Sequence, residues 1–377
     1  MTGRQDQAAA YEQLYTAAAR MLWSQENPTW RRKEQHPRFG WPPERCAAWQ
    51  ALENCLLAAD AEQPKAGEPS DPARHLITRR APGGEDRPLG FQEALDEWIT
   101  RLDADQGYLV DEQLQPGACV MTSAIRHWLT AFALRELAFR MAPGRPPVTI
   151  GPGAAKLSAM AHEAANALRT PLDITAPTPH TPGTEPWITS TPRPVSDLPD
   201  LSARLEELRA VAWRAAEAVP TTDELKATVD FTVMMEASVA ASDVLTLLQG
   251  RPAPAWREFL DGIDPAHHLA WGAYTDNEQR RRPESLRAEA DKWAEALADD
   301  PTPWTLTKYQ DPPARHMGAE VVVLSSTRAA VFAELLDELA ARLRPGMHTG
   351  RIHYSAYDLC HFIDHRFRRE LGEHIGL

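Results

Sequence analysis

The chain has 377 residues, of which 43% are hydrophobic and 25% are charged, and its formal net charge at pH 7 is −13. A chain of this length can bury a large hydrophobic core and is expected to form one large domain or, in the favoured interpretation, two domains. The net negative charge argues against delocalised binding to nucleic acid or to an anionic membrane, because both carry charge of the same sign.

The distribution of apolar residues and cysteines indicates where the protein works. No run approaches the roughly 18 apolar residues of a transmembrane helix, and the first residues, MTGRQDQAAAYEQ, are polar. The four cysteines, Cys46, Cys55, Cys119 and Cys360, lack C-x-x-C spacing and are too few for a disulfide framework. We therefore expect a soluble, cytoplasmic protein that does not engage membranes.

The N-terminal half is predicted to be helical. Apolar residues recur at helical spacing over residues 5–23, 43–60, 90–103, 120–141 and 157–168. The segment 120–141 is long and mostly apolar, which predicts the core helix of this half. Residues 62–88 are rich in proline and glycine and are predicted to form a loop. The connector over residues 27–45 is basic and aromatic. Its residues Arg31, Arg32, Lys33 and Arg38 are the only feature of the sequence that suggests binding of nucleic acid.

A proline- and threonine-rich segment, residues 170–199, separates the halves and is predicted to be a linker or a strap over the surface. Beyond it, helices are predicted over residues 201–218, 221–249, 277–298, 327–343 and 355–371, with a short helix starting at Asp264. The segment 221–249 is apolar on every side, which predicts a buried core helix. Residues 319–324, AEVVVL, are the best strand candidate, with a second short extended piece at 351–354.

These patterns predict a mainly α fold with two helical halves, 1–169 and 200–377, built around the core helices 120–141 and 221–249. We expect at most a small β element, near residues 319–324 and 351–354. Each half has one core helix, but the two sequences show no repeat that can be recognised by inspection.

The most suggestive polar cluster lies in the last predicted helix. Asp358, His361 and His365 fall on one helical stripe, and a histidine pair at i, i+4 can chelate one metal ion. His361 to His365 reads H-x-x-D-H, which resembles the H-x-x-E-H signature of the inverzincin metalloproteases. Asp364 replaces the glutamate that would act as the base, so the chain is not assigned to that family. The alternative is that Ser355 and Asp358 form a capping box and the histidines face solvent.

A second candidate is Glu236, in the middle of the predicted helix 221–249. A buried carboxylate must be paired or protonated, and groups with shifted pKa values are often functional. The alternative is an ion pair with an arginine of a neighbouring helix, such as Arg126 or Arg135. A di-iron type of site joining Glu236 to Glu136, His127 and His162 is disfavoured, because the repeated E-x-x-H of such sites is missing.

Two classes of function follow. The first is a non-catalytic helical binding or scaffolding protein that engages a protein partner or a second copy of itself. The second is a helical metal-dependent enzyme in which Asp358, His361 and His365 hold a divalent metal ion, with Glu236 or Asp364 as the catalytic carboxylate.

Overall fold

The computed structural model describes residues 2–25, 41–60, 64–105, 119–145, 147–172, 174, 194–219, 231–251, 264–270, 284–298, 300, 321–368 and 371. The fold is mainly α, as predicted, and the described residues also form two small sheets of two strands each. No helix among the described residues is long and apolar enough to cross a membrane.

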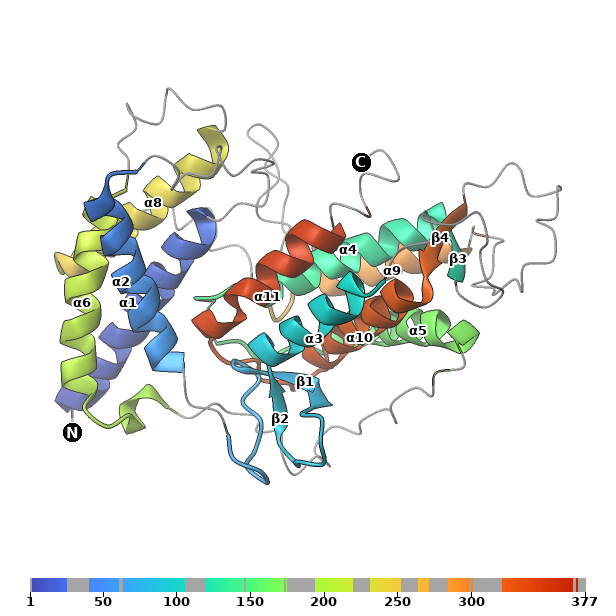
Figure 1. The fold of residues 1–377 in the computed structure, drawn as a ribbon, viewed down its shortest axis with the longest axis horizontal. Coiled ribbons are helices and arrows are strands. Elements are labelled where there is room, and N and C mark those ends of the chain that lie inside the picture. The colour runs from blue at the N-terminus through green and yellow to red at the C-terminus, as the bar shows by residue number, and fades with distance from the viewer. Residues whose placement is uncertain are drawn as a thin grey trace.

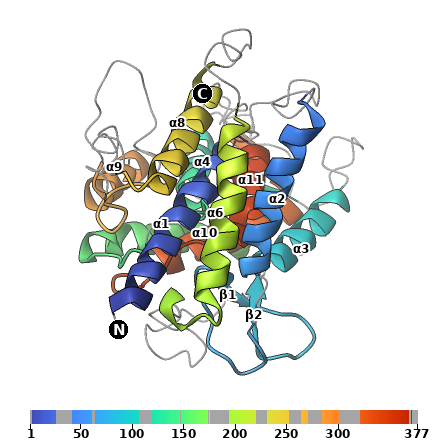
Figure 2. The same cartoon turned by 90° about the vertical axis from the view of Figure 1, so that its left-hand side faces the viewer.

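At one end of the molecule, four helices of the described part of the chain form a bundle (Figures 1 and 2). It consists of α1 (Thr2–Gln25), α2 (Pro43–Asp60), α6 (Leu201–Glu217) and α8 (Phe231–Leu248). Helix α1 lies against α8, and α2 lies against α6. Tyr15, Trp49 and Leu208 are buried in the core of the bundle, which therefore contains residues from both halves of the sequence.

The other end of the molecule contains the remaining elements packed around a second core. From the first half come β1 (His75–Arg80), β2 (Pro88–Gly90), α3 (Phe91–Asp103), β3 (Cys119–Ser123), α4 (Ala124–Arg140) and α5 (Ala155–Arg169). From the second half come α9 (Leu286–Ala298), β4 (Val321–Ser325), α10 (Ser326–Arg342), α11 (Tyr357–Phe362) and the π-helical turn η7 (Ile363–Arg368).

The structure reveals an internal repeat. The interpretation that the two halves of the sequence show no recognisable repeat was therefore wrong. Residues 119–157 and 321–359 align without a gap, and each segment forms a strand, a serine-capped helix, a turn and a second helix. Identical residues mark the caps, turns and buried pairs: Ser123 and Ser325, Arg126 and Arg328, Glu136 and Glu338, Arg140 and Arg342, Pro143 and Pro345, Gly144 and Gly346, Ile150 and Ile352, Leu157 and Leu359.

The repeat extends to the elements before it. The sequence DPARHL (71–76) corresponds to DPAHHL (264–269), and in each the second residue after the Asp donates its backbone N–H to that carboxylate at 2.9 Å. Trp98 of α3 corresponds to Trp293 of α9. The spacing between equivalent residues changes at the connecting loops, which hides the repeat from inspection.

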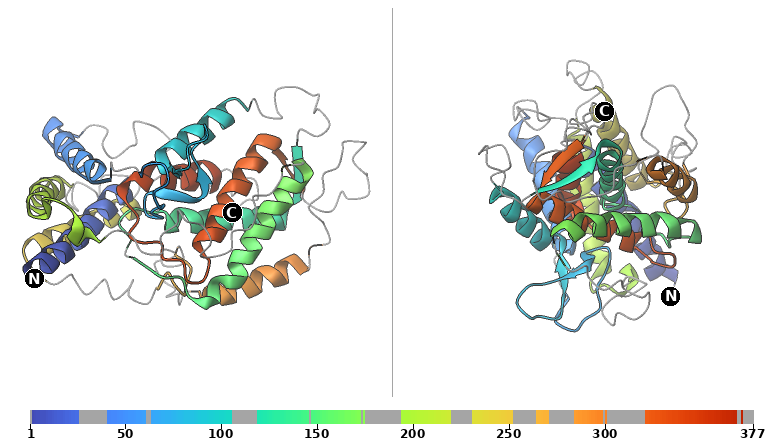
Figure 3. Two further views of the ribbon diagram at one scale, coloured as in Figure 1. Left: turned by 90° about the horizontal axis from the view of Figure 1, so that it is seen from below. Right: turned by 90° about the vertical axis from the view of Figure 1, so that its right-hand side faces the viewer.

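An approximate twofold axis relates the two halves. Strands β3 and β4 pair antiparallel, and the equivalent residues Met121 and Val323 face each other at the centre of the register. The right-hand view of Figure 3 shows the two strands side by side. Pairing of equivalent positions with each other is the signature of a twofold, isologous contact.

Backbone contacts between the halves are reciprocal, as a twofold axis requires. The N–H of Gly144 donates to the carbonyl of Ile352 at 3.0 Å, and the N–H of Gly346 donates to the carbonyl of Ile150 at 2.9 Å. Both glycines have positive φ, of 76° and 81°, which L-residues with side chains rarely adopt. Each half thus completes the turn of the other.

Two equivalent buried ion pairs also join the halves. Glu338 of α10 accepts from Arg342 Nε at 2.8 Å and from the N–H of Ile77 at 3.0 Å. Glu136 of α4 accepts from Arg140 Nε at 2.6 Å and from the N–H of Ala270 at 2.9 Å. Each carboxylate therefore binds backbone from the opposite half. The segments before 170 and after 199 are thus interlocked, and they do not pack around separate cores.

Several local expectations differ from the structure. The predicted helix 120–141 is the strand β3 followed by α4, because Ser123 caps the helix by accepting from the N–H of Arg126. The predicted loop 62–88 contains β1 and ends where β2 begins, and the segment from Asp264 makes a turn and an isolated bridge in place of a short helix. The strand near 319–324 is confirmed as β4, whereas residues 351–354 lead without regular structure into a 3-10 turn, η6 (Tyr354–Ala356).

Other expectations fall outside the described residues. These include most of the linker or strap 170–199 and the basic connector with Arg31, Arg32, Lys33 and Arg38.

Candidate functional site

The twofold relation separates side chains that both halves need for folding from those that one half has alone. Glu136 and Glu338, or Ser123 and Ser325, make the same contacts in both halves, and their role is structural. Function is better sought where equivalent positions differ in size or charge.

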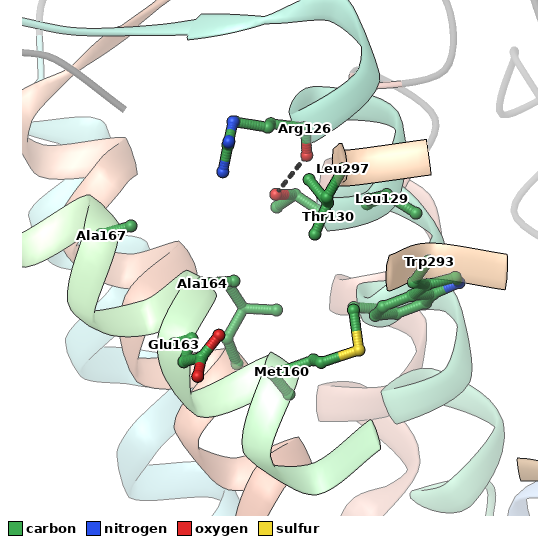
Figure 4. Close-up of a pocket in the computed structure, with 12 residues that line it drawn as sticks. Arg126, Leu129, Thr130, Met160, Glu163, Ala164, Ala167, Trp293 and Leu297 are labelled. Atoms are coloured by element: carbon green, nitrogen blue, oxygen red, sulfur yellow. Dashed lines mark hydrogen bonds between the residues drawn. The ribbon is translucent and has the colours of Figure 1, made fainter. Parts of the chain in front are cut away.

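One set of such differences surrounds a pocket of about 250 Å³ between α4, α5, α9 and α10. Figure 4 shows Arg126 on α4 facing Glu163 and Met160 on α5 across this pocket, with Trp293 of α9 at one side. The floor is buried and mostly apolar, and it is formed by Leu129, Thr130, Ala133, Ala161, Trp293 and Leu336. Met160, Ala164, Ala167 and Leu297 are half-buried and surround the opening.

Larger side chains occupy the equivalent place in the other half. Thr130 corresponds to Phe332, Ala133 to Leu335 and Ala161 to Ile363, and all three larger side chains are buried. Phe332 packs against Phe367 with ring centroids 4.8 Å apart, and Ala165 stands at the position equivalent to Phe367. The pocket therefore arises from a set of large-to-small differences between the halves. Interiors are normally close-packed, so an opening made by several coordinated differences is more than a packing defect.

The polar groups of the floor are already hydrogen-bonded. The Thr130 hydroxyl donates to the Arg126 carbonyl at 2.9 Å, and the Trp293 indole N–H donates to Glu289 at 2.9 Å. Burial raises the pKa of that Glu289 carboxyl, although the indole N–H opposes the shift. The floor thus presents an apolar surface, and the charged side chains of the pocket lie at its rim.

Two charged side chains stand at the rim. Arg126 donates from Nε to Asp300 at 2.9 Å, and this pair corresponds to Arg328 and Asp105 in the other half, whose Nε and Oδ2 are 3.8 Å apart. Glu163 is exposed. The pocket is thus an apolar cavity with a carboxylate and a guanidinium–carboxylate pair at its mouth.

A second departure from the twofold relation is a buried polar cluster that joins the helical bundle to the rest of the molecule. Asp60 accepts from the Tyr15 hydroxyl at 2.8 Å, from His353 Nδ1 at 2.5 Å and from the N–H of Ser355 at 2.9 Å. Arg351 lies 3.6 Å from the centre of the Tyr15 ring. The positions equivalent to Arg351, His353 and Tyr354 are Thr149, Gly151 and Pro152, which cannot make this cluster.

Electrostatics keeps His353 neutral and Asp60 ionised in this cluster. Burial lowers the pKa of His353, although Asp60 opposes the shift. Burial acts to raise the pKa of Asp60, but His353 and Arg351 outweigh it and hold that pKa below its usual range. The side chains of Asp60 and His353 are 1% and 8% exposed, so the cluster is a closed joint between the bundle and the segment 351–355. We assign it a structural role.

The cluster predicted in the last helix is spread over different environments. Asp358 and His365 are exposed, while His361 packs edge-on against Tyr357, with ring centroids 4.5 Å apart. Asp364 accepts from Arg368 Nε at 2.5 Å, within the turn η7. A π-helical turn holds more residues than an α-helical one, which shifts His365 off the stripe that an α-helix would give.

The predicted capping box in this region is also replaced by other contacts. Helix α11 begins after Ala356 without a side-chain cap, and the N–H of Ser355 donates to Asp60. No group of three or more His, Cys, Asp and Glu residues that could hold a metal ion occurs among the described residues. The metal role of Asp358, His361 and His365 and the catalytic role of Asp364 stay predictions, as does that of Glu236, whose side chain lies outside the described residues.

The pocket residues were not singled out from the sequence. Thr130, Ala133 and Ala161 are ordinary residues of apolar helices, and their meaning appears once Phe332, Leu335 and Ile363 are recognised as their equivalents. That comparison was the signal in the sequence that could have found them.

Comparison with known proteins gives no relative for this chain. No protein-family model, no curated protein and no solved structure matches it.

Proposed function

We propose that the protein is a non-catalytic binding protein whose ligand is a small, mainly apolar molecule held between α4, α5, α9 and α10. The observation that supports this proposal is the set of small residues, Thr130, Ala133 and Ala161, at positions where the other half carries Phe332, Leu335 and Ile363.

The volume of the pocket limits the size of the ligand. An apolar cavity of about 150 Å³ holds benzene. The pocket of about 250 Å³ therefore suits a molecule of roughly ten non-hydrogen atoms. Binding sites for small molecules are typically concave and apolar with a few polar groups, as this pocket is.

This proposal keeps the class of non-catalytic binding protein and assigns the pocket to a small molecule. Engagement of a protein partner, self-association and metal-dependent catalysis stay predictions.

The test is a screen of small apolar compounds by ligand-observed NMR on the full chain. We expect binders that the variant Ala133→Leu no longer binds, because the leucine places in the pocket the side chain that Leu335 places in the other half. Ala159→Leu is the matched control, since Ala159 is exposed on α5 and does not line the pocket.

Two outcomes would contradict the proposal. The first is that no compound binds up to millimolar concentration, and the second is that Ala133→Leu binds the same compounds as the unmodified protein. If Ala133→Leu fails to fold, Thr130→Phe provides the same test with the residue found at the equivalent position.

A further inference from the structure

The charges around the pocket indicate which kind of small molecule it takes. Arg126 is held by Asp300, whose side chain is 3% exposed and also accepts from the Ser123 hydroxyl at 2.6 Å. This pair is close to neutral as a unit. Among the described residues that line the pocket, the remaining charged side chain is Glu163, so this part of the mouth carries an excess of negative charge.

Three neighbouring basic side chains on α5 and α9 are engaged elsewhere. On α5, Lys156 donates to Asp291 at 2.7 Å, and Arg169 pairs with Asp337 of α10. On α9, Lys292 lies 2.9 Å from Glu284.

The other half shows that the fold does not require a carboxylate at the position of Glu163. Its equivalent is His365, and the next residue, Ala164, is equivalent to Arg366. Arg366 pairs with Asp103 at 3.3 Å. The closed side of the twofold thus has basic residues at this place, and the open side has an acidic one.

We propose that the pocket binds a small apolar amine, with the ammonium group at Glu163 and the apolar body against Met160, Ala133 and Trp293. This inference rests on the proposed function and adds the charge of the ligand to it.

The test compares three compounds of nearly equal size and shape: 3-phenylpropylamine, 3-phenylpropanol and 3-phenylpropionate. Dissociation constants are measured by NMR titration at low and at high salt. We expect the amine to bind up to about fivefold more tightly than the alcohol, which is the upper end of the range for an ion pair at an exposed site. The preference should shrink at high salt, because exposed charges are screened.

The variant Glu163→Gln should weaken binding of the amine to the level of the alcohol and leave the alcohol unchanged. Glu207→Gln is the control, because Glu207 is an exposed carboxylate on α6 in the helical bundle, far from the lining residues. It should leave all three constants unchanged.

The outcomes separate the two proposals. If alcohol and amine bind equally, or if the carboxylate binds most tightly, the inference about charge is overturned while the binding function stands. An amine preference that survives in Glu163→Gln also overturns it. If none of the three compounds binds and the wider apolar screen also fails, the binding function itself is overturned.

Discussion

The buried pair of Glu338 and Arg342 offers the sharpest test of how the two halves are held together. Glu338 is 1% exposed and accepts from the N–H groups of Ile77 and Thr78, from the Thr78 hydroxyl and from Arg342 Nε. Arg342 is 0% exposed, and its Nη2 donates to the carbonyl of His75 at 3.2 Å. Glu338→Ala therefore leaves a buried guanidinium and two backbone N–H groups without their anion.

The expected cost follows from that geometry. Breaking a buried ion pair by removing one partner typically destabilises by about 3–5 kcal/mol, because an uncompensated charge stays buried. Burial lowers the pKa of Arg342 even though Glu338 opposes the shift, which shows how strongly this site disfavours an unpaired cation. We expect Glu338→Ala to lower the free energy of unfolding by an amount in this range.

Urea unfolding followed by circular dichroism measures the effect. Glu136→Ala should cost a similar amount, because Glu136 and Arg140 make the equivalent pair with side chains 1% and 4% exposed. The double variant Glu338→Met/Arg342→Met should be less destabilised than Glu338→Ala, since it removes both charges. Glu206→Ala, at an exposed site on α6, is the control. A cost below about 1 kcal/mol for both single variants, the level of an exposed pair, would refute the interlocked arrangement.

Three further predictions concern pH and the joint between bundle and core. Burial lowers the pKa of His75 to about 4, so the unfolded chain binds a proton that the folded chain rejects, and stability falls as pH drops below about 6.5. From pH 7 to pH 5 His75 contributes a loss of about 2 kcal/mol, so the urea curves of His75→Gln should show about that much less loss over this range than those of the unmodified protein. Asp60→Asn should destabilise by about 2–3 kcal/mol, because a buried acceptor of three donors is lost, and hydrogen exchange should show faster opening at residues 351–355. Gly144→Ala should cost at least about 2 kcal/mol by thermal unfolding, because φ is +76° and the new Cβ would lie 2.5 Å from a backbone oxygen of α1. Unchanged stability in either of these last two variants would contradict the described joint.

Local patterns predicted most helices because apolar periodicity reports the face that packs. Residues 90–103 illustrate this, since Phe91, Ala94, Trp98 and Leu102 share one face and are all buried in α3. The strands were harder to predict. In β3 the apolar run continues into α4 with no proline or glycine between them, so the cap at Ser123 was the single local mark of the boundary.

The repeat and the pocket could not be predicted from local patterns. Glu136 and Glu338 bind backbone from the opposite half, and no local pattern in the sequence states which segment a buried carboxylate will meet. The pocket depends on the absence of side-chain volume at Thr130, Ala133 and Ala161, which is visible against Phe332, Leu335 and Ile363 once the halves are superimposed. The prediction that Asp358, His361 and His365 share one stripe assumed a regular α-helix. Residues 363–368 instead form the π-helical turn η7, which changes the direction of His365.

The pocket is open on one side of the twofold axis, and the equivalent place on the other side is filled by larger side chains. Crystals pressurised with xenon test this directly, because xenon enters apolar cavities and scatters strongly. We predict a xenon site between Ala133, Met160 and Trp293, and no xenon at the equivalent place beside Phe332. A pocket without xenon, or equal occupancy at the two places, would contradict the account.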